Sequence, residues 1–78
     1  MVIIYLGFNS KIRKEEAYKI IKKYFNCFTT YKVDGFYYGK KVETLKIEIL
    51  TKDKTKIIKL KNKLEKEFKQ KEVLLIHN

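Results

Sequence analysis

Apolar, β-branched and aromatic residues follow one another almost without interruption in Val2-Ile3-Ile4-Tyr5-Leu6-Gly7-Phe8. The run is too short for a helix of a globular protein and lacks polar alternation, so it indicates a strand that is buried on both faces. Such a strand belongs in the middle of a sheet. We therefore expect the rest of the chain to be arranged around residues 2–8.

Two amphipathic helices are predicted. The first extends over residues 11–26 after the capping pair Asn9-Ser10, and its apolar residues recur at spacings of three and four. The second follows the capping residue Asp53 and runs to about Gln70. Its apolar stripe consists of Ile57, Leu60, Leu64 and Phe68.

Three further strands complete the pattern. Residues 28–38 are rich in Thr, Tyr and Phe, residues 42–50 alternate between apolar and polar, and residues 72–76 are mostly apolar. Two segments have the chemistry of a turn between the first two of these strands. Asp34-Gly35 is the stronger local hairpin signal, whereas Gly39-Lys40-Lys41 gives two arms of similar length. We prefer the second and expect Asp34-Gly35 to form a bulge.

The order βαββαβ predicts a single domain over residues 1–78 with the ferredoxin-like α+β fold. In this fold a four-stranded antiparallel sheet carries two helices on one face, with the first and third strands central. The last strand is apolar and is placed at an edge of the sheet. Because an apolar edge invites pairing with another chain, we expect a homodimer or another partner there.

The composition excludes several classes of protein. The 78 residues fit one domain, and 45% hydrophobic with 14% aromatic residues excludes disorder. No apolar run approaches the roughly 18 residues of a membrane span, and we expect neither a signal peptide nor a membrane partner. Cys27 has no second cysteine to pair with, so we expect the protein to reside in a reducing cytoplasm. We also expect the Cys27 thiol, which lies between Phe25 and Phe28 in the sequence, to be buried and unreactive.

Catalytic side chains are scarce. The chain has one histidine, one cysteine and one serine, namely His77, Cys27 and Ser10. A nucleophile and its base would have to be Cys27 and His77, and nothing else supports that pair. No cluster has metal-ligand spacing, and the three glycines are isolated, so there is no phosphate-binding loop. We expect no catalytic residues, no metal and no cofactor.

Lysine dominates the charge. The net charge is +10, and all but one of the 19 basic residues are lysine. The lysines at i, i+3, i+7 and i+10 of the second helix form one stripe opposite its apolar residues, and the first helix carries a shorter patch. The candidates are Lys56, Lys59, Lys63 and Lys66 in the stripe and Lys19, Lys22 and Lys23 in the patch. Two interpretations remain open: a solvated face enriched in lysine by A/T-rich codons, or a polyanion-binding face. Lysine lacks the bidentate contacts with which arginine reads bases, so sequence-specific duplex recognition is disfavoured.

Aromatic residues gather on the first two strands. If the predicted core residues face the helices, some tyrosines must face the open side of the sheet. RNA-recognition domains stack bases on such a face, but a dimer mate or another protein would cover it equally well. The candidates for this aromatic sheet face are Tyr5, Tyr31, Phe36 and Tyr38.

A series of short motifs spans nearly the whole chain. They are Tyr5-Leu6-Gly7, Phe28-Thr29-x-Tyr31, Gly35-Phe36-Tyr37-x-Gly39, Leu45-x-Ile47-Glu48-Ile49 and Phe68-x-Gln70-x-x-Val73-Leu74. The series resembles a group of short, uncharacterised proteins, a domain of unknown function, from bacteria, phages and plasmids. The resemblance implies the ferredoxin-like fold and a mobile-element context. It carries no established activity, so no functional residue can be transferred.

Two functions fit these observations. The first is a non-enzymatic protein that binds and occludes a nucleic-acid-handling host complex, protein or ribonucleoprotein, as an anti-defence inhibitor of the anti-CRISPR type would. The alternative is direct binding of single-stranded RNA or DNA with little sequence preference. Strong salt dependence of oligonucleotide binding is expected only of the second.

Overall fold

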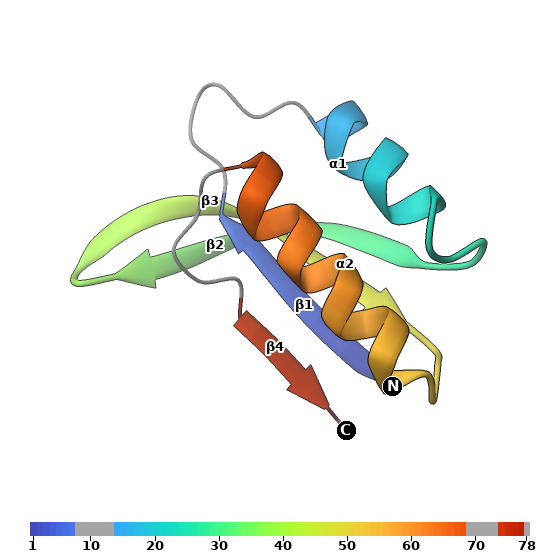
Figure 1. Ribbon diagram of the computed structural model, residues 1–78. Coiled ribbons are helices and arrows are strands. Elements are labelled where there is room, and N and C mark those ends of the chain that lie inside the picture. The colour runs from blue at the N-terminus through green and yellow to red at the C-terminus, as the bar shows by residue number, and fades with distance from the viewer. Residues whose placement is uncertain (8–13, 69–73, 78) are drawn as a thin grey trace.

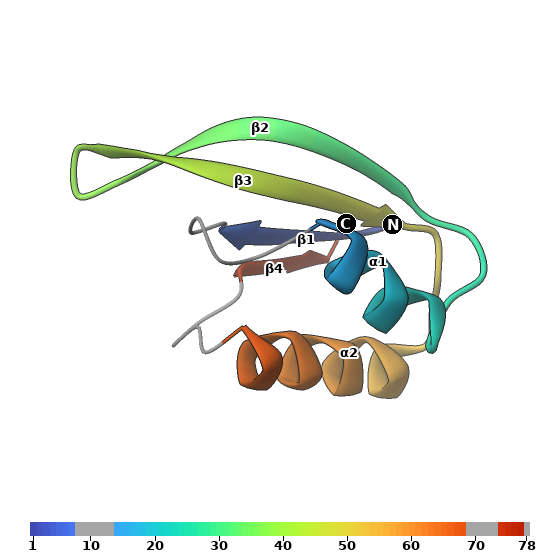
Figure 2. The same ribbon diagram turned by 90° about the horizontal axis from the view of Figure 1, so that it is seen from above.

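Six elements follow one another in the order βαββαβ in the computed structural model, which describes residues 1–7, 14–68 and 74–77 (Figure 1). They are β1 (Val2–Gly7), α1 (Lys14–Lys22), β2 (Thr29–Tyr37), β3 (Lys40–Ile49), α2 (Lys54–Glu67) and β4 (Leu74–His77). The strands form one antiparallel sheet in the order β2-β3-β1-β4. Both helices cover the same face of this sheet (Figure 2). The fold is the predicted ferredoxin-like sandwich, with β1 and β3 in the centre.

The central strand β1 has one buried face and one half-buried face. Alternate residues from Val2 to Leu6 are almost fully buried beneath the helices, whereas Ile3 and Tyr5 are half-buried on the opposite face. The expectation of a strand buried on both faces is therefore wrong. Within the described ranges no second layer covers the open face of the sheet, so the apolar residues there are shielded only by their neighbours on the same face (Figure 2).

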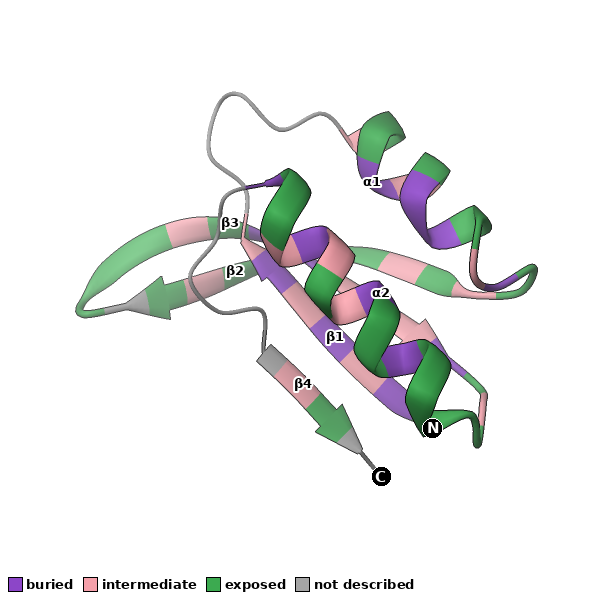
Figure 3. Ribbon diagram, in the orientation of Figure 1, coloured by how far each residue is buried: buried purple, intermediate pink, exposed green. Residues whose placement is uncertain are grey.

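Each helix contributes one buried stripe to the core (Figure 3). On α1 this stripe comprises Ala17, Ile20 and Ile21. On α2 the predicted positions are buried, from Ile57 to Phe68. Burying each such aliphatic side chain stabilises the fold by roughly 1.5–3 kcal/mol relative to exposure.

The helix boundaries follow from local hydrogen bonds. Asp53 caps α2 as predicted, since its Oδ1 accepts the backbone N–H of Lys56 at 3.0 Å. The helix ends at Glu67, and the predicted end at Gln70 lies outside the described residues. α1 ends at Lys22, four residues earlier than predicted, because the chain tightens into a turn in which the N–H of Lys23 bonds the carbonyl of Ile20. The predicted caps at 9–10 also lie outside the described residues.

A two-residue turn, Tyr38-Gly39, joins β2 to β3. Both residues have positive φ, 52° and 77°, as a type I′ hairpin turn requires. The preference for a turn near Gly39 over one at Asp34-Gly35 is thus confirmed, but the turn begins one residue earlier than predicted, and Lys40 and Lys41 belong to β3. The expected bulge is not observed, because Asp34 and Gly35 pair with Glu43 and Val42 in an unbroken register. The hairpin extends well past the helices and past β1 and β4 (Figure 2).

The last strand lies at an edge of the sheet, as predicted. β4 pairs with β1 alone, and Ile76, which is opposite Ile3 in the register, is 37% exposed. Pairing of this edge with a second chain stays a prediction. Among the helical segments that the structure describes, none is long and apolar enough to cross a membrane.

Candidate binding surfaces

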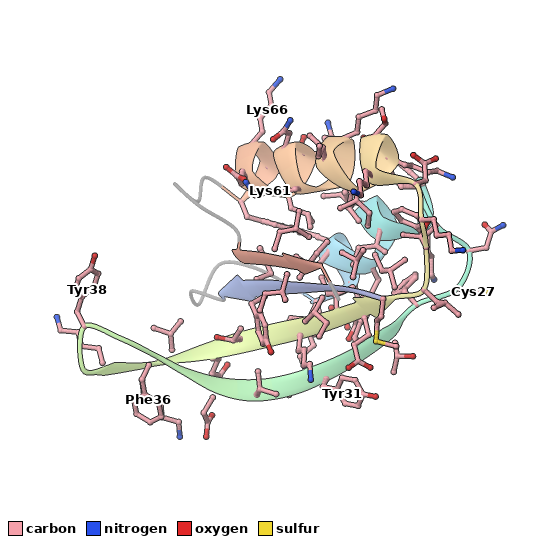
Figure 4. The ribbon with its side chains drawn as sticks, turned by 90° about the horizontal axis from the view of Figure 1, so that it is seen from below. Cys27, Tyr31, Phe36, Tyr38, Lys61 and Lys66 are labelled. Carbon is pink, nitrogen blue, oxygen red and sulfur yellow. The ribbon has the colours of Figure 1, made fainter. Side chains whose placement is uncertain are left out.

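The helical lysines and the tyrosines of the sheet lie on opposite sides of the molecule. In Figure 4, Lys66 projects from α2 away from the sheet, whereas Tyr31 projects from the other face of the sheet. The full thickness of the helix layer and the sheet separates them. A short ligand therefore contacts one surface or the other, but not both.

The predicted lysine stripe is present on α2, although two of its four charges have neighbours. Lys56 Nζ lies 5.1 Å from the centre of the Phe25 ring, a cation–π distance. Lys63 Nζ lies 2.9 Å from Glu67 Oε1. Lys59 and Lys66 are exposed and have no ion-pair partner in the described part of the chain. These two ammonium groups are the ones that remain open to a ligand.

The Glu67 carboxylate is bonded to one lysine of α2 and is influenced by the charges of two more. The hydrogen bond from Lys63 lowers the pKa of Glu67, and the charges of Lys66 and Lys23 lower it further. The same hydrogen bond raises the pKa of Lys63. α1 and α2 are in contact, and the charge of Lys23, which follows α1 directly, acts on Glu67 of α2. We call the resulting surface the basic helical face: Lys19, Lys22, Lys23, Lys56, Lys59, Lys63 and Lys66.

On the open face, Tyr5, Lys46 and Tyr31 form a row across three strands. Lys46 is the register partner of Tyr5 on β1 and of Tyr31 on β2. Its Nζ lies 5.7 Å from the centre of the Tyr31 ring and 3.4 Å from Glu48 Oε2. The Tyr31 side chain, 45% exposed, therefore already has a cation beside its ring. Only the strand register places Lys46 between the two tyrosines, so nothing in the sequence distinguishes it from the other lysines.

The four predicted aromatic residues do not share one face. Phe36 pairs with Lys41 near the end of the hairpin; its ring projects away from the helices, as that of Tyr31 does, but from a different part of the twisted hairpin (Figure 4). Tyr38 belongs to the turn and not to a strand. Only Tyr5 and Tyr31 lie together on the open face.

Of the three residues with catalytic chemistry, the structure describes the side chain of Cys27, while Ser10 and the side chain of His77 lie outside what it describes. Cys27 is exposed in the connection between α1 and β2, so the prediction of a buried thiol is wrong. Its neighbour Phe25 is buried and Phe28 is half-buried, but the cysteine between them faces solvent. In residues 1–7, 14–68 and 74–77, no group of three His, Cys, Asp or Glu residues is placed to hold a metal ion.

Known proteins offer no relative from which a function could be transferred. No family model, no curated protein and no solved structure matches the chain.

Proposed function

We propose that this protein is a non-enzymatic binding protein that docks its basic helical face on a negatively charged surface of a nucleic-acid-handling complex and blocks that surface. The supporting observation is the pair of open lysines on α2, Lys59 and Lys66. The net charge of +10 attracts such a surface over long range.

The separation of the two surfaces favours this function over direct binding of a single strand. Proteins that bind single strands without sequence preference combine a basic groove with aromatic rings on which successive bases stack. Here Tyr31 and the basic helical face lie on opposite sides of the sheet (Figure 4). Direct binding of a single strand is supported by the row of Tyr5, Lys46 and Tyr31. However, this row contains one lysine, Lys46, which is already paired with Glu48.

Its small size suits a protein that acts by covering a partner. A standard interface takes about 800 Å² from each partner, roughly one seventh of the 5840 Å² surface of this molecule. We further propose, from the resemblance to the uncharacterised family, that the protein comes from a phage or another mobile element. It would then act in the host cytoplasm against a defence complex, as anti-CRISPR inhibitors do.

Two charge-reversed variants test the proposal. Lys59→Glu with Lys66→Glu changes the basic helical face, and Lys32→Glu with Lys52→Glu is the control on exposed lysines elsewhere. Each double variant lowers the net charge from +10 to +6, because each substitution subtracts two charges. Tagged proteins are used to capture partners from a lysate of the host. The first variant should lose a complex that the wild type and the control both capture. Equal capture by both variants, or no captured complex at all, would contradict the proposal.

A further inference from the structure

We propose that the end of the β2–β3 hairpin is a finger that binds an unpaired strand of nucleic acid, with Tyr38 stacking on a base and Lys40 contacting the adjacent phosphate. The proposal extends the proposed function, since a complex that handles nucleic acid exposes unpaired strands. It concerns a different part of the molecule, and its test does not depend on the basic helical face.

The backbone of Tyr38 is strained. Its φ of 52° lies in the left-handed region, which bulky residues rarely adopt. The first position of a type I′ turn is ordinarily Asn, Asp or Gly. Strained residues of this kind concentrate where a protein contacts its ligands, because there the side chain serves a purpose other than stability.

No contact of the Tyr38 side chain compensates for this strain. The Tyr38 side chain is fully exposed, and within the described residues it has no hydrogen bond and no ring contact. Phe36, two residues earlier, is 70% exposed. Figure 4 shows that the two rings point in different directions from the end of the hairpin, so each presents its own surface to solvent.

Positive charge follows Tyr38 closely in the sequence. Lys40 and Lys41 follow the turn directly, and residues 36–41 include no acidic residue. Lys41 Nζ lies 3.5 Å from Asp34 Oδ2 in a solvent-exposed pair, whereas Lys40 has no partner among the residues that the structure describes. The hairpin end therefore joins an open ring to an unpaired ammonium group. Tyr31 on the open face lacks this combination, because Lys46 beside it is paired with Glu48.

The shape of the hairpin favours a nucleic-acid strand as the occupant. The hairpin projects beyond the helices and ends in a convex tip (Figures 2 and 4). Every base has a flat face that stacks on an exposed aromatic ring, and a neighbouring lysine neutralises the phosphate. An apolar protein pocket would fit the ring but would leave Lys40 without a counter-charge.

The test uses the full chain and a short fluorescein-labelled oligothymidylate at about 50 mM salt, where phosphate contacts are strong. Fluorescence anisotropy compares the wild type with Tyr38→Asn, Tyr38→Phe and, as the matched control, Tyr31→Asn. Tyr38→Asn should weaken binding roughly 5- to 150-fold, the loss of one stacked base, without lowering the melting temperature. Tyr38→Phe keeps a ring and should retain the affinity, and Tyr31→Asn should leave it unchanged.

Three outcomes would overturn the proposal: no measurable binding by the wild type, equal affinity of Tyr38→Asn and the wild type, or loss of affinity in Tyr31→Asn alone. The first would point to a protein pocket as the occupant of the tip. Ultraviolet crosslinking of the oligonucleotide separates this proposal from the proposed function. The Lys59→Glu/Lys66→Glu variant should still crosslink at Tyr38 even if it no longer captures the host complex.

Discussion

The first position of the β2–β3 turn holds Tyr38 at a φ of 52°, and replacing it with Asn is expected to raise the free energy of unfolding. The left-handed conformation costs an L-residue roughly 1–2 kcal/mol, and Asn tolerates it better because its side chain bonds the local backbone. Removing the ring does not reduce the apolar area that is buried on folding, since the Tyr38 side chain is fully exposed. The expected net gain is about 1 kcal/mol, which corresponds to a rise of about 4–8 °C in the melting temperature of a domain of this size.

Thermal and urea unfolding followed by circular dichroism measure this gain. The urea midpoint should rise with no change in the slope m, because the variant exposes the same surface on unfolding. Phe36→Asn is the control. Phe36 lies within β2, where Asn is disfavoured, so this variant should be no more stable than the wild type. A melting temperature of Tyr38→Asn at or below that of the wild type would refute the argument that Tyr38 is kept at a cost in stability.

Four further predictions concern the core, a helix cap, an ion pair and the cysteine. Leu64→Ala removes a fully buried side chain and should cost about 2–5 kcal/mol in urea unfolding; an unchanged midpoint would contradict the observed packing. Asp53→Ala should cost about 1 kcal/mol by removing the cap of α2, whereas Asp53→Asn should cost less, and equal losses would argue against capping. The hydrogen bond from Lys63 holds the pKa of Glu67 below its ordinary value, so the stabilisation from this pair is present at neutral pH and is lost as the pH falls through that lowered pKa. Lys63→Gln should raise the pKa of Glu67 in an NMR titration, and an unchanged pKa would show that the pair does not form. The exposed thiol of Cys27 should react with a thiol reagent in the native protein as fast as in urea, and strong protection would contradict its exposure.

The elements that the sequence predicts well are those whose apolar spacing is unambiguous. The burial of Leu45, Ile47 and Ile49 on one face of β3 and the buried stripe from Ile57 to Phe68 follow directly from where apolar residues recur. The cap at Asp53 is local chemistry, and it forms as predicted. These features depend on residues that are close together in the sequence, so they can be predicted from it.

The features that the sequence predicts poorly depend on contacts across the fold. The direction of the Phe36 ring depends on whether Asp34-Gly35 forms a bulge and on how far the hairpin twists, and neither can be read from the sequence. Lys46 lies beside Tyr31 because β3 runs antiparallel to β2. Cys27 lies between two aromatic residues in the sequence, but in a connecting segment such neighbours do not determine which side chain turns inward.

Lysine footprinting tests whether the basic helical face is where this protein meets its partner. Acetylation of the captured complex and of the free protein, read by mass spectrometry, reports on lysines on every side of the molecule. Lys59 and Lys66 should be protected in the complex, while Lys32 and Lys52 should stay as reactive as in the free protein. Full reactivity of Lys59 and Lys66 in a complex that protects Lys46 would place the partner on the open face of the sheet and contradict the proposed function.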